Sequence, residues 1–138
     1  MACRPVTAAS TWLLALYLIA PRLVAGDLDP ATRQTLIDGV TTATAMDLYH
    51  ARCRGDISGR QTDNLNKLLV SKLRTTVLSV EDDLFPERSY RLTRQRLEQD
   101  FLARLRDVGG CPGAKETGLP DRLRASYEAA LEAIRALP

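Results

Sequence analysis

Four stretches of this chain carry apolar residues at helical spacing, and glycine or proline lies between one stretch and the next. No six-residue segment alternates apolar with polar residues in the way a half-buried strand does. This pattern constrains the fold most, because each stretch must bury its apolar side against another helix. The sequence therefore predicts an all-α protein.

The first predicted helix begins at Asp29 and ends near Cys53. Asp29 is a favourable N-cap, Pro30 suits the first helical position, and Gly55 is placed to end the helix. The residues expected on its apolar face are Ile37, Val40, Thr44, Leu48 and Ala51.

The second predicted helix follows Ser58 and ends near Val80. Ser58 and Gln61 have the spacing of a capping box, in which each side chain binds the other's backbone N–H. Its apolar face comprises Leu65, Leu68, Leu69, Leu73, Val77 and Val80. Residues 81–85 are expected to form a connection.

The third predicted helix begins at Pro86 and ends at Gly109, and the fourth begins at Pro120. Residues 111–118 are rich in helix breakers and are expected to form a loop. The expected core positions of these two helices are Tyr90, Leu97, Phe101, Leu105, Val108, Leu123, Tyr127, Ala130, Leu131 and Ile134.

Short connections between four amphipathic helices favour a small antiparallel four-helix bundle. In such a bundle the first and third helices end at the same place, where Cys53 and Cys111 fall. We therefore expect a disulfide between them, contributing about 4 kcal/mol through the long loop that it closes. A free catalytic thiol, a metal ligand and an intermolecular bridge are the alternatives.

Residues 1–26 have the layout of a secretory signal peptide, with Arg4, an apolar run at 11–20, and cleavage expected next to Gly26. A proline and an arginine interrupt the run short of the ~20 residues that span a membrane, so we expect no stable membrane anchor after cleavage. Residues 27–138 then form a single helical domain in the periplasm or outside the cell.

The charge of the processed chain is balanced. The leader contains two arginines and no acidic residue, so the chain's 19 basic and 17 acidic residues become 17 of each. Nucleic-acid binding depends on neutralising phosphates, so a neutral exported domain is a poor nucleic-acid binder. No phosphate-binding or dinucleotide motif occurs, and we expect no cofactor.

His50 is the only histidine and precedes Cys53 by three residues. That spacing could form a Cys–His nucleophile, but oxidation of Cys53 removes the thiol, and His50 lies opposite the predicted apolar face. One histidine and two bonded cysteines also cannot make a usual zinc site, so no metal is expected. The adjacent Glu81, Asp82 and Asp83 leave open a weak calcium site.

Four arginines surround Tyr90, and they are a predicted contact for an anion or an acidic partner: Arg88, Arg91, Arg94 and Arg96. They spread around most of a helical wheel, so the alternative is a solvated helix with internal ion pairs. Arg94 lies nearest the apolar stripe and is expected to pair with an acid on another helix.

These observations favour a small exported, most plausibly periplasmic, protein that binds a protein partner, as an inhibitor, immunity or chaperone-like module does. The alternatives are a small enzyme that uses His50 with an acidic residue, and a structural or stress-protective component without a specific ligand.

The cysteine pair generates the first test. Replacing Cys53 or Cys111 with serine should lower the free energy of unfolding by roughly 2–5 kcal/mol. Replacing His50 with alanine should change it little. Thermal melts of the variants under oxidising conditions check both statements, and a cysteine variant as stable as the parent would contradict the first.

Overall fold

The computed structural model describes residues 28–138, and within that range helices are the only regular secondary structure. The predicted signal peptide lies outside the described residues. The elements are α1 (Pro30–Tyr49), the π-helical η2 (His50–Arg54), α2 (Arg60–Leu73), α3 (Val77–Asp83), α4 (Tyr90–Asp107), α5 (Gly110–Glu116) and α6 (Leu119–Ala136). The all-α prediction is confirmed, but six α-helices stand where four were expected.

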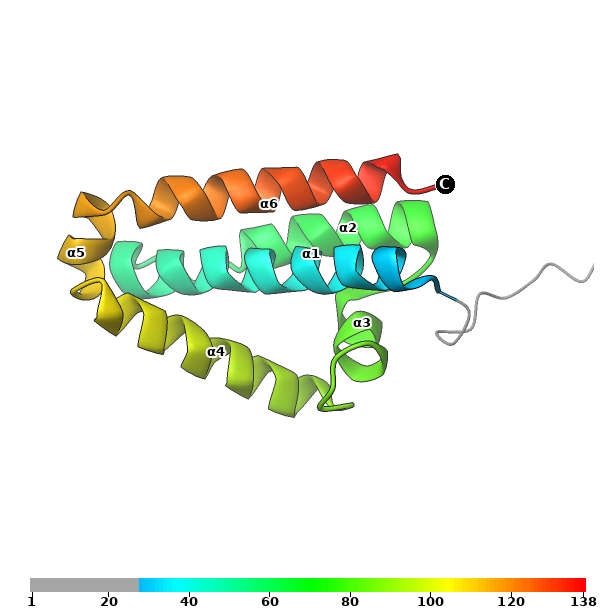
Figure 1. Cartoon of the computed structure of the whole chain (residues 1–138), viewed down its shortest axis with the longest axis horizontal. Coiled ribbons are helices and arrows are strands. Elements are labelled where there is room, and N and C mark those ends of the chain that lie inside the picture. The colour runs from blue at the N-terminus through cyan, green and yellow to red at the C-terminus, as the bar shows by residue number, and fades with distance from the viewer. Residues whose placement is uncertain (1–27) are drawn as a thin grey trace, which may run out of the picture.

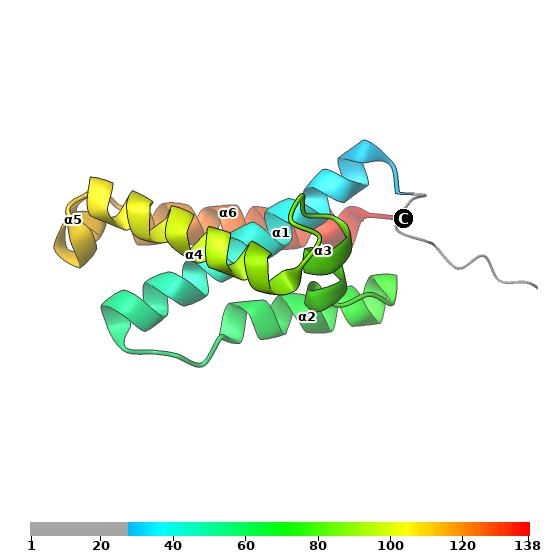
Figure 2. The same ribbon diagram turned by 90° about the horizontal axis from the view of Figure 1, so that it is seen from below.

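The longer helices α1, α2, α4 and α6 alternate in direction along the chain, while α3 and α5 lie toward opposite ends of the molecule (Figure 1). Helix α1 contacts α2, α3, α4 and α6, most extensively α6. Seen from below, α4 crosses in front of α1 and α2 runs along another side (Figure 2). No helix in residues 28–138 is long and apolar enough to cross a membrane.

The start of α1 follows the prediction. Asp29 accepts hydrogen bonds from the backbone N–H groups of Ala31 and Thr32, each 3.0 Å long, and Pro30 opens the helix. The predicted apolar face is wrong in detail, because only Val40 of its five residues is fully buried. The buried positions are Leu36, Gly39, Val40, Ala43, Met46 and Tyr49. Ile37 and Leu48 also pack against the core, as expected of a helix with neighbours on several sides.

The turn between α1 and α2 differs from the predicted capping box. Helix α1 widens into η2, and Gly55 ends it in the left-handed conformation, as predicted. Helix α2 then begins without a cap from Ser58. Its backbone N–H groups at Gln61 and Thr62 instead donate to the carboxylate of Asp47, at 3.0 and 2.8 Å. A carboxylate on the preceding helix therefore caps α2.

The predicted second helix is two helices. Arg74 adopts a left-handed conformation (φ 56°) that ends α2, and Thr76 caps α3 by accepting a hydrogen bond from the Ser79 backbone N–H. The Asn66 side chain accepts a further hydrogen bond from the Val77 backbone N–H at 2.9 Å. These polar groups stabilise a break inside a continuous apolar pattern.

Two predicted connections are also helical. Residues 81–83 complete α3, and α4 begins at Tyr90 rather than Pro86, because the Asp82 carboxylate accepts a hydrogen bond from the Tyr90 backbone N–H at 2.6 Å. The predicted loop at 111–118 contains α5, whose seven residues end before Gly118. The expected boundary near Pro120 is confirmed, since this residue lies in the first turn of α6.

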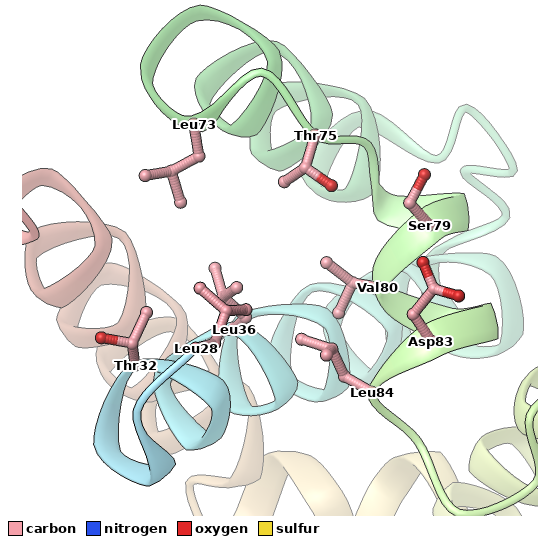
Figure 3. Close-up of a pocket in the computed structure, with 9 residues that line it drawn as sticks. All are labelled: Leu28, Thr32, Leu36, Leu73, Thr75, Ser79, Val80, Asp83 and Leu84. Atoms are coloured by element: carbon pink, nitrogen blue, oxygen red, sulfur yellow. The ribbon is translucent and has the colours of Figure 1, made fainter. Parts of the chain in front are cut away.

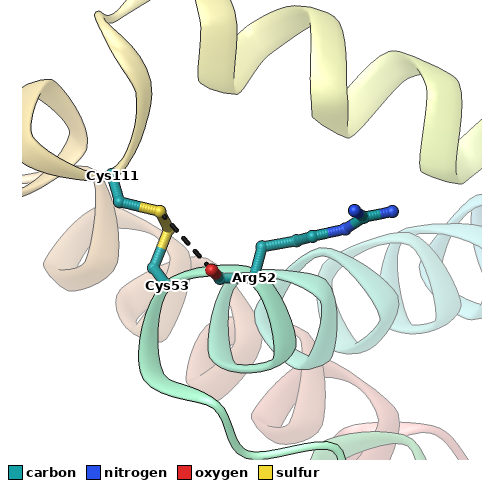
Figure 4. Close-up of a disulfide and its surroundings, with 3 residues drawn as sticks. All are labelled: Arg52, Cys53 and Cys111. Atoms are coloured by element: carbon teal, nitrogen blue, oxygen red, sulfur yellow. Dashed lines mark hydrogen bonds between the residues drawn. A yellow bond between two sulfur atoms is a disulfide. The ribbon is translucent and has the colours of Figure 1, made fainter.

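The disulfide is present. Cys53 in η2 and Cys111 in α5 are bonded, with their Cα atoms 5.4 Å apart (Figure 4). The Cys111 Sγ lies 3.7 Å from the backbone oxygen of Arg52, a contact rather than a hydrogen bond because a bonded sulfur has no proton to donate. The Arg52 side chain reaches Glu98 on α4 at 2.8 Å. The segment η2, which continues α1, is thus tied to α5 by the disulfide and to α4 by the ion pair.

Substitutions at two glycines test how closely the helices pack. A Cβ on Gly113 would lie 1.7 Å from the backbone oxygen of Val108, whereas one on Gly39 would meet side-chain ends alone, Ile134 Cδ1 at 2.8 Å and Leu65 Cδ1 at 3.5 Å. Gly113→Ala should therefore cost more than about 2 kcal/mol, because backbone must move. Gly39→Ala should stay within about 1 kcal/mol, because the gain in helix propensity offsets the crowding. Urea denaturation measures both, and the reverse order would contradict this packing.

Candidate functional site

The four predicted arginines do not form one patch. Arg88 and Arg91 are exposed, and each makes one hydrogen bond nearby, to the Asp83 backbone oxygen at 2.9 Å and to the Tyr90 hydroxyl at 3.2 Å. Arg94 and Arg96 point toward acidic residues of other segments. Their predicted role as a partner contact stays a prediction.

Arg94 pairs with an acid on another helix, as expected. Its guanidinium donates from Nε to both Glu81 carboxylate oxygens at 3.0 Å, and its terminal nitrogen lies 2.9 Å from the second oxygen. The Glu81 side chain is 2% exposed and the Arg94 side chain 51% exposed. The hydrogen bond to Glu81 raises the pKa of Arg94 above its ordinary value, although desolvation opposes this. The pair joins α3 to α4 at the wall of a hollow of about 410 Å³.

Arg96 holds the turn before α4. It binds Glu87 in that turn and Asp100 on its own helix at 3.0 Å, and its guanidinium lies 5.9 Å from the centre of the Phe85 ring. The hydrogen bond from Arg96 lowers the pKa of Glu87 below its usual value. Arg96 therefore has a structural role, while part of its side chain remains at the surface.

The three consecutive acids do not converge. Glu81 is buried against Arg94, Asp82 binds the N-terminus of α4, and Asp83 is exposed. No group of three or more histidine, cysteine or acidic side chains that could hold a metal ion exists in residues 28–138. Calcium needs several converging oxygens, and in this arrangement the three carboxylates have different surroundings.

His50 lies in a polar cluster between η2, α2 and α6. Its Nδ1 is 3.2 Å from the Gln61 side-chain nitrogen, and the Tyr127 hydroxyl donates to the Gln61 backbone oxygen at 3.0 Å. Both oxygens of Asp47, one turn before His50, are occupied by the N-terminus of α2. His50 thus has an amide partner, and its nearest upstream carboxylate serves as a helix cap.

A groove runs between α1 and α4. It encloses about 480 Å³, and its apolar lining is Ile37, Ala45, Phe85, Pro86, Leu97 and Phe101. The polar residues around it are Gln34, Asp38, Thr41, Arg96, Asp100 and Arg104. One turn before Arg96 on α4, Leu92 is 55% exposed and lies beside the polar rim, outside the lining of the groove. An apolar floor with a charged rim is the usual composition of a protein-binding surface.

Sequence reasoning identified Arg94 and Arg96 but missed the groove and the role of Asp47. The groove joins residues about 60 positions apart, so no local pattern reveals it. Asp47 lies in the middle of a predicted helix, and an acidic side chain at such a position is ordinarily expected to be exposed to solvent.

Comparisons with protein-family models, with curated proteins and with solved structures return no match to this chain.

The Glu81–Arg94 pair generates an asymmetric prediction. Arg94→Gln leaves a buried carboxylate without its guanidinium and should cost about 3 kcal/mol of folding stability. Glu81→Gln leaves a half-exposed arginine that water can solvate, and should cost about 1 kcal/mol. Urea denaturation at pH 7 measures both changes in the free energy of unfolding. The matched control is Arg91→Gln at an exposed position, for which the change should be near zero. An equal or larger cost for Glu81→Gln would refute the asymmetry.

Proposed function

We propose that this chain is an exported, periplasmic protein that acts by binding a protein partner through the surface formed by α1 and α4. In this proposal an antiparallel four-helix arrangement of α1, α2, α4 and α6 is the scaffold, and the disulfide suits it to an oxidising compartment. Inhibitors, immunity proteins and chaperone-like proteins act in this way.

The groove between α1 and α4 is the observation that carries the proposal. Phe85 and Phe101 form its buried floor, at 2% and 4% exposed, and the more accessible Ile37, Ala45 and Pro86 supply apolar surface at its opening. Outside the lining of the groove, the start of α4 exposes Leu92, Arg88 and Arg91. A partner helix with an apolar face and a few acidic side chains would complement this groove and the arginines beside it.

The enzyme alternative receives less support from the geometry. It requires a carboxylate that hydrogen-bonds His50, whereas Asp56, which interacts with His50 electrostatically, accepts from the Ser58 backbone N–H, and the amide of Gln61 lies within hydrogen-bond reach of His50. Gln61 can fix the ring's orientation but cannot take or supply a proton at neutral pH.

Capture from the native exported fraction tests the proposal. The tagged full chain should retain one partner protein in stoichiometric amount. Leu92→Asp should abolish capture of that partner because it places a charge beside the groove, and Ala45→Arg should do so because the larger side chain fills the groove. Val70→Asp is the matched control, since Val70 is an exposed aliphatic residue on α2, away from the groove.

Circular dichroism of each variant establishes that the helices are retained. Recovery of no stoichiometric protein, or equal recovery by the groove variants and Val70→Asp, would refute the proposal.

A further inference from the structure

A second concave site lies at the end of the molecule where α1 begins. It encloses about 230 Å³ between the first turns of α1, the end of α2 and α3. Leu36, Leu73 and Val80 point into this space from three different helices (Figure 3). Its nine lining residues are Leu28, Thr32, Leu36, Leu73, Thr75, Ser79, Val80, Asp83 and Leu84, and none of them lines the groove between α1 and α4.

The floor of this cavity belongs to the protein core. Leu36, Val80 and Leu84 are 2%, 2% and 8% exposed, so the space is a pocket sunk into the core rather than an apolar patch on the surface. The break between α2 and α3 at Arg74 creates it, because α3 turns away from the line of α2 (Figure 1). An apolar pocket of this kind binds water poorly and apolar groups well.

The polar residues at the mouth of the cavity determine which polar group a bound apolar ligand could carry. Thr75, Ser79 and Asp83 lie on its polar side, and the Ser79 hydroxyl is already 2.9 Å from the Thr76 hydroxyl. Among the described residues no side chain binds the Asp83 carboxylate, and Arg88 binds the backbone oxygen of Asp83 instead. A carboxylate head group would therefore face a like charge, whereas a hydroxyl or ammonium group could bind Asp83.

We propose that this cavity binds a medium-length alkyl chain that carries a hydroxyl or ammonium head group. An apolar cavity of about 150 Å³ accommodates the six carbons of benzene, so 230 Å³ accommodates about nine carbons. The chain lies against Leu36, Leu73 and Val80, and the head group lies at Asp83. This ligand site is independent of the partner surface on α1 and α4.

Titration of the purified full chain with 1-octanol, octylammonium and octanoate, each below its aggregation concentration, tests the proposal. Methyl NMR shifts of leucine and valine residues follow binding. The alcohol and the ammonium compound should bind at least about fivefold more tightly than octanoate, because of the charge on Asp83. Asp83→Asn should remove that difference. Along a series of alcohols, affinity should stop rising beyond about nine carbons.

Cavity-filling variants locate the binding. Leu73→Trp should abolish binding of 1-octanol, and Val70→Trp, almost one turn earlier on the exposed side of α2, should leave it unchanged. Thr75→Phe at the mouth is a second blocking variant in case Leu73→Trp unfolds. Leu92→Asp should bind 1-octanol as the parent does, which separates this test from the partner experiment.

Absence of binding to the parent chain overturns the proposal, whether the cavity is closed in solution or is covered by the chain's own N-terminal residues. Binding that survives both blocking variants, or octanoate binding as tight as octylammonium binding, also overturns it.

Discussion

The packing of α1 among four other helices is the constraint on which the described fold depends. Helices α2, α3, α4 and α6 all contact it. Close approach at Gly39 brings Leu65 of α2 and Ile134 of α6 against its backbone. Each hollow discussed above has α1 as one wall, at residues 32–36 for the apolar cavity, 34–45 for the groove and 44–48 for the hollow beside Glu81. The concave surfaces are therefore properties of one central helix and its neighbours.

Buried and partly buried polar side chains fix how the helices meet one another. Asp47 ties α2 to α1 by capping it, and Glu81 ties α3 to α4 through Arg94. Within residues 28–138 no buried side-chain nitrogen or oxygen lacks a hydrogen-bond partner. Since an unsatisfied buried polar group costs about 1–3 kcal/mol, these contacts favour one arrangement of the helices over its alternatives. The disulfide adds a covalent constraint where η2, the continuation of α1, meets α5.

Local chemistry explains what the sequence predicted well. Asp29 with Pro30, Gly55, Gly109 and the Gly118–Pro120 region mark boundaries that the structure confirms, because capping and left-handed termini depend on neighbouring residues alone. The failures involve distant partners. The break at Arg74 uses a non-glycine residue in a left-handed conformation, supported by Asn66 eleven residues before Val77. The cap from Asp47, the groove and the apolar cavity all require tertiary contacts that no periodicity encodes.

Native-state hydrogen exchange measures the role of α1 most directly. If α1 is the shared core of the fold, the backbone N–H groups of its buried stretch, Leu36–Met46, should exchange only through global unfolding. Their opening free energies should then equal the stability measured by denaturation and exceed those of α3 and α5. Exchange of this stretch through a local opening, at a free energy below that of α2 or α6, would contradict the account.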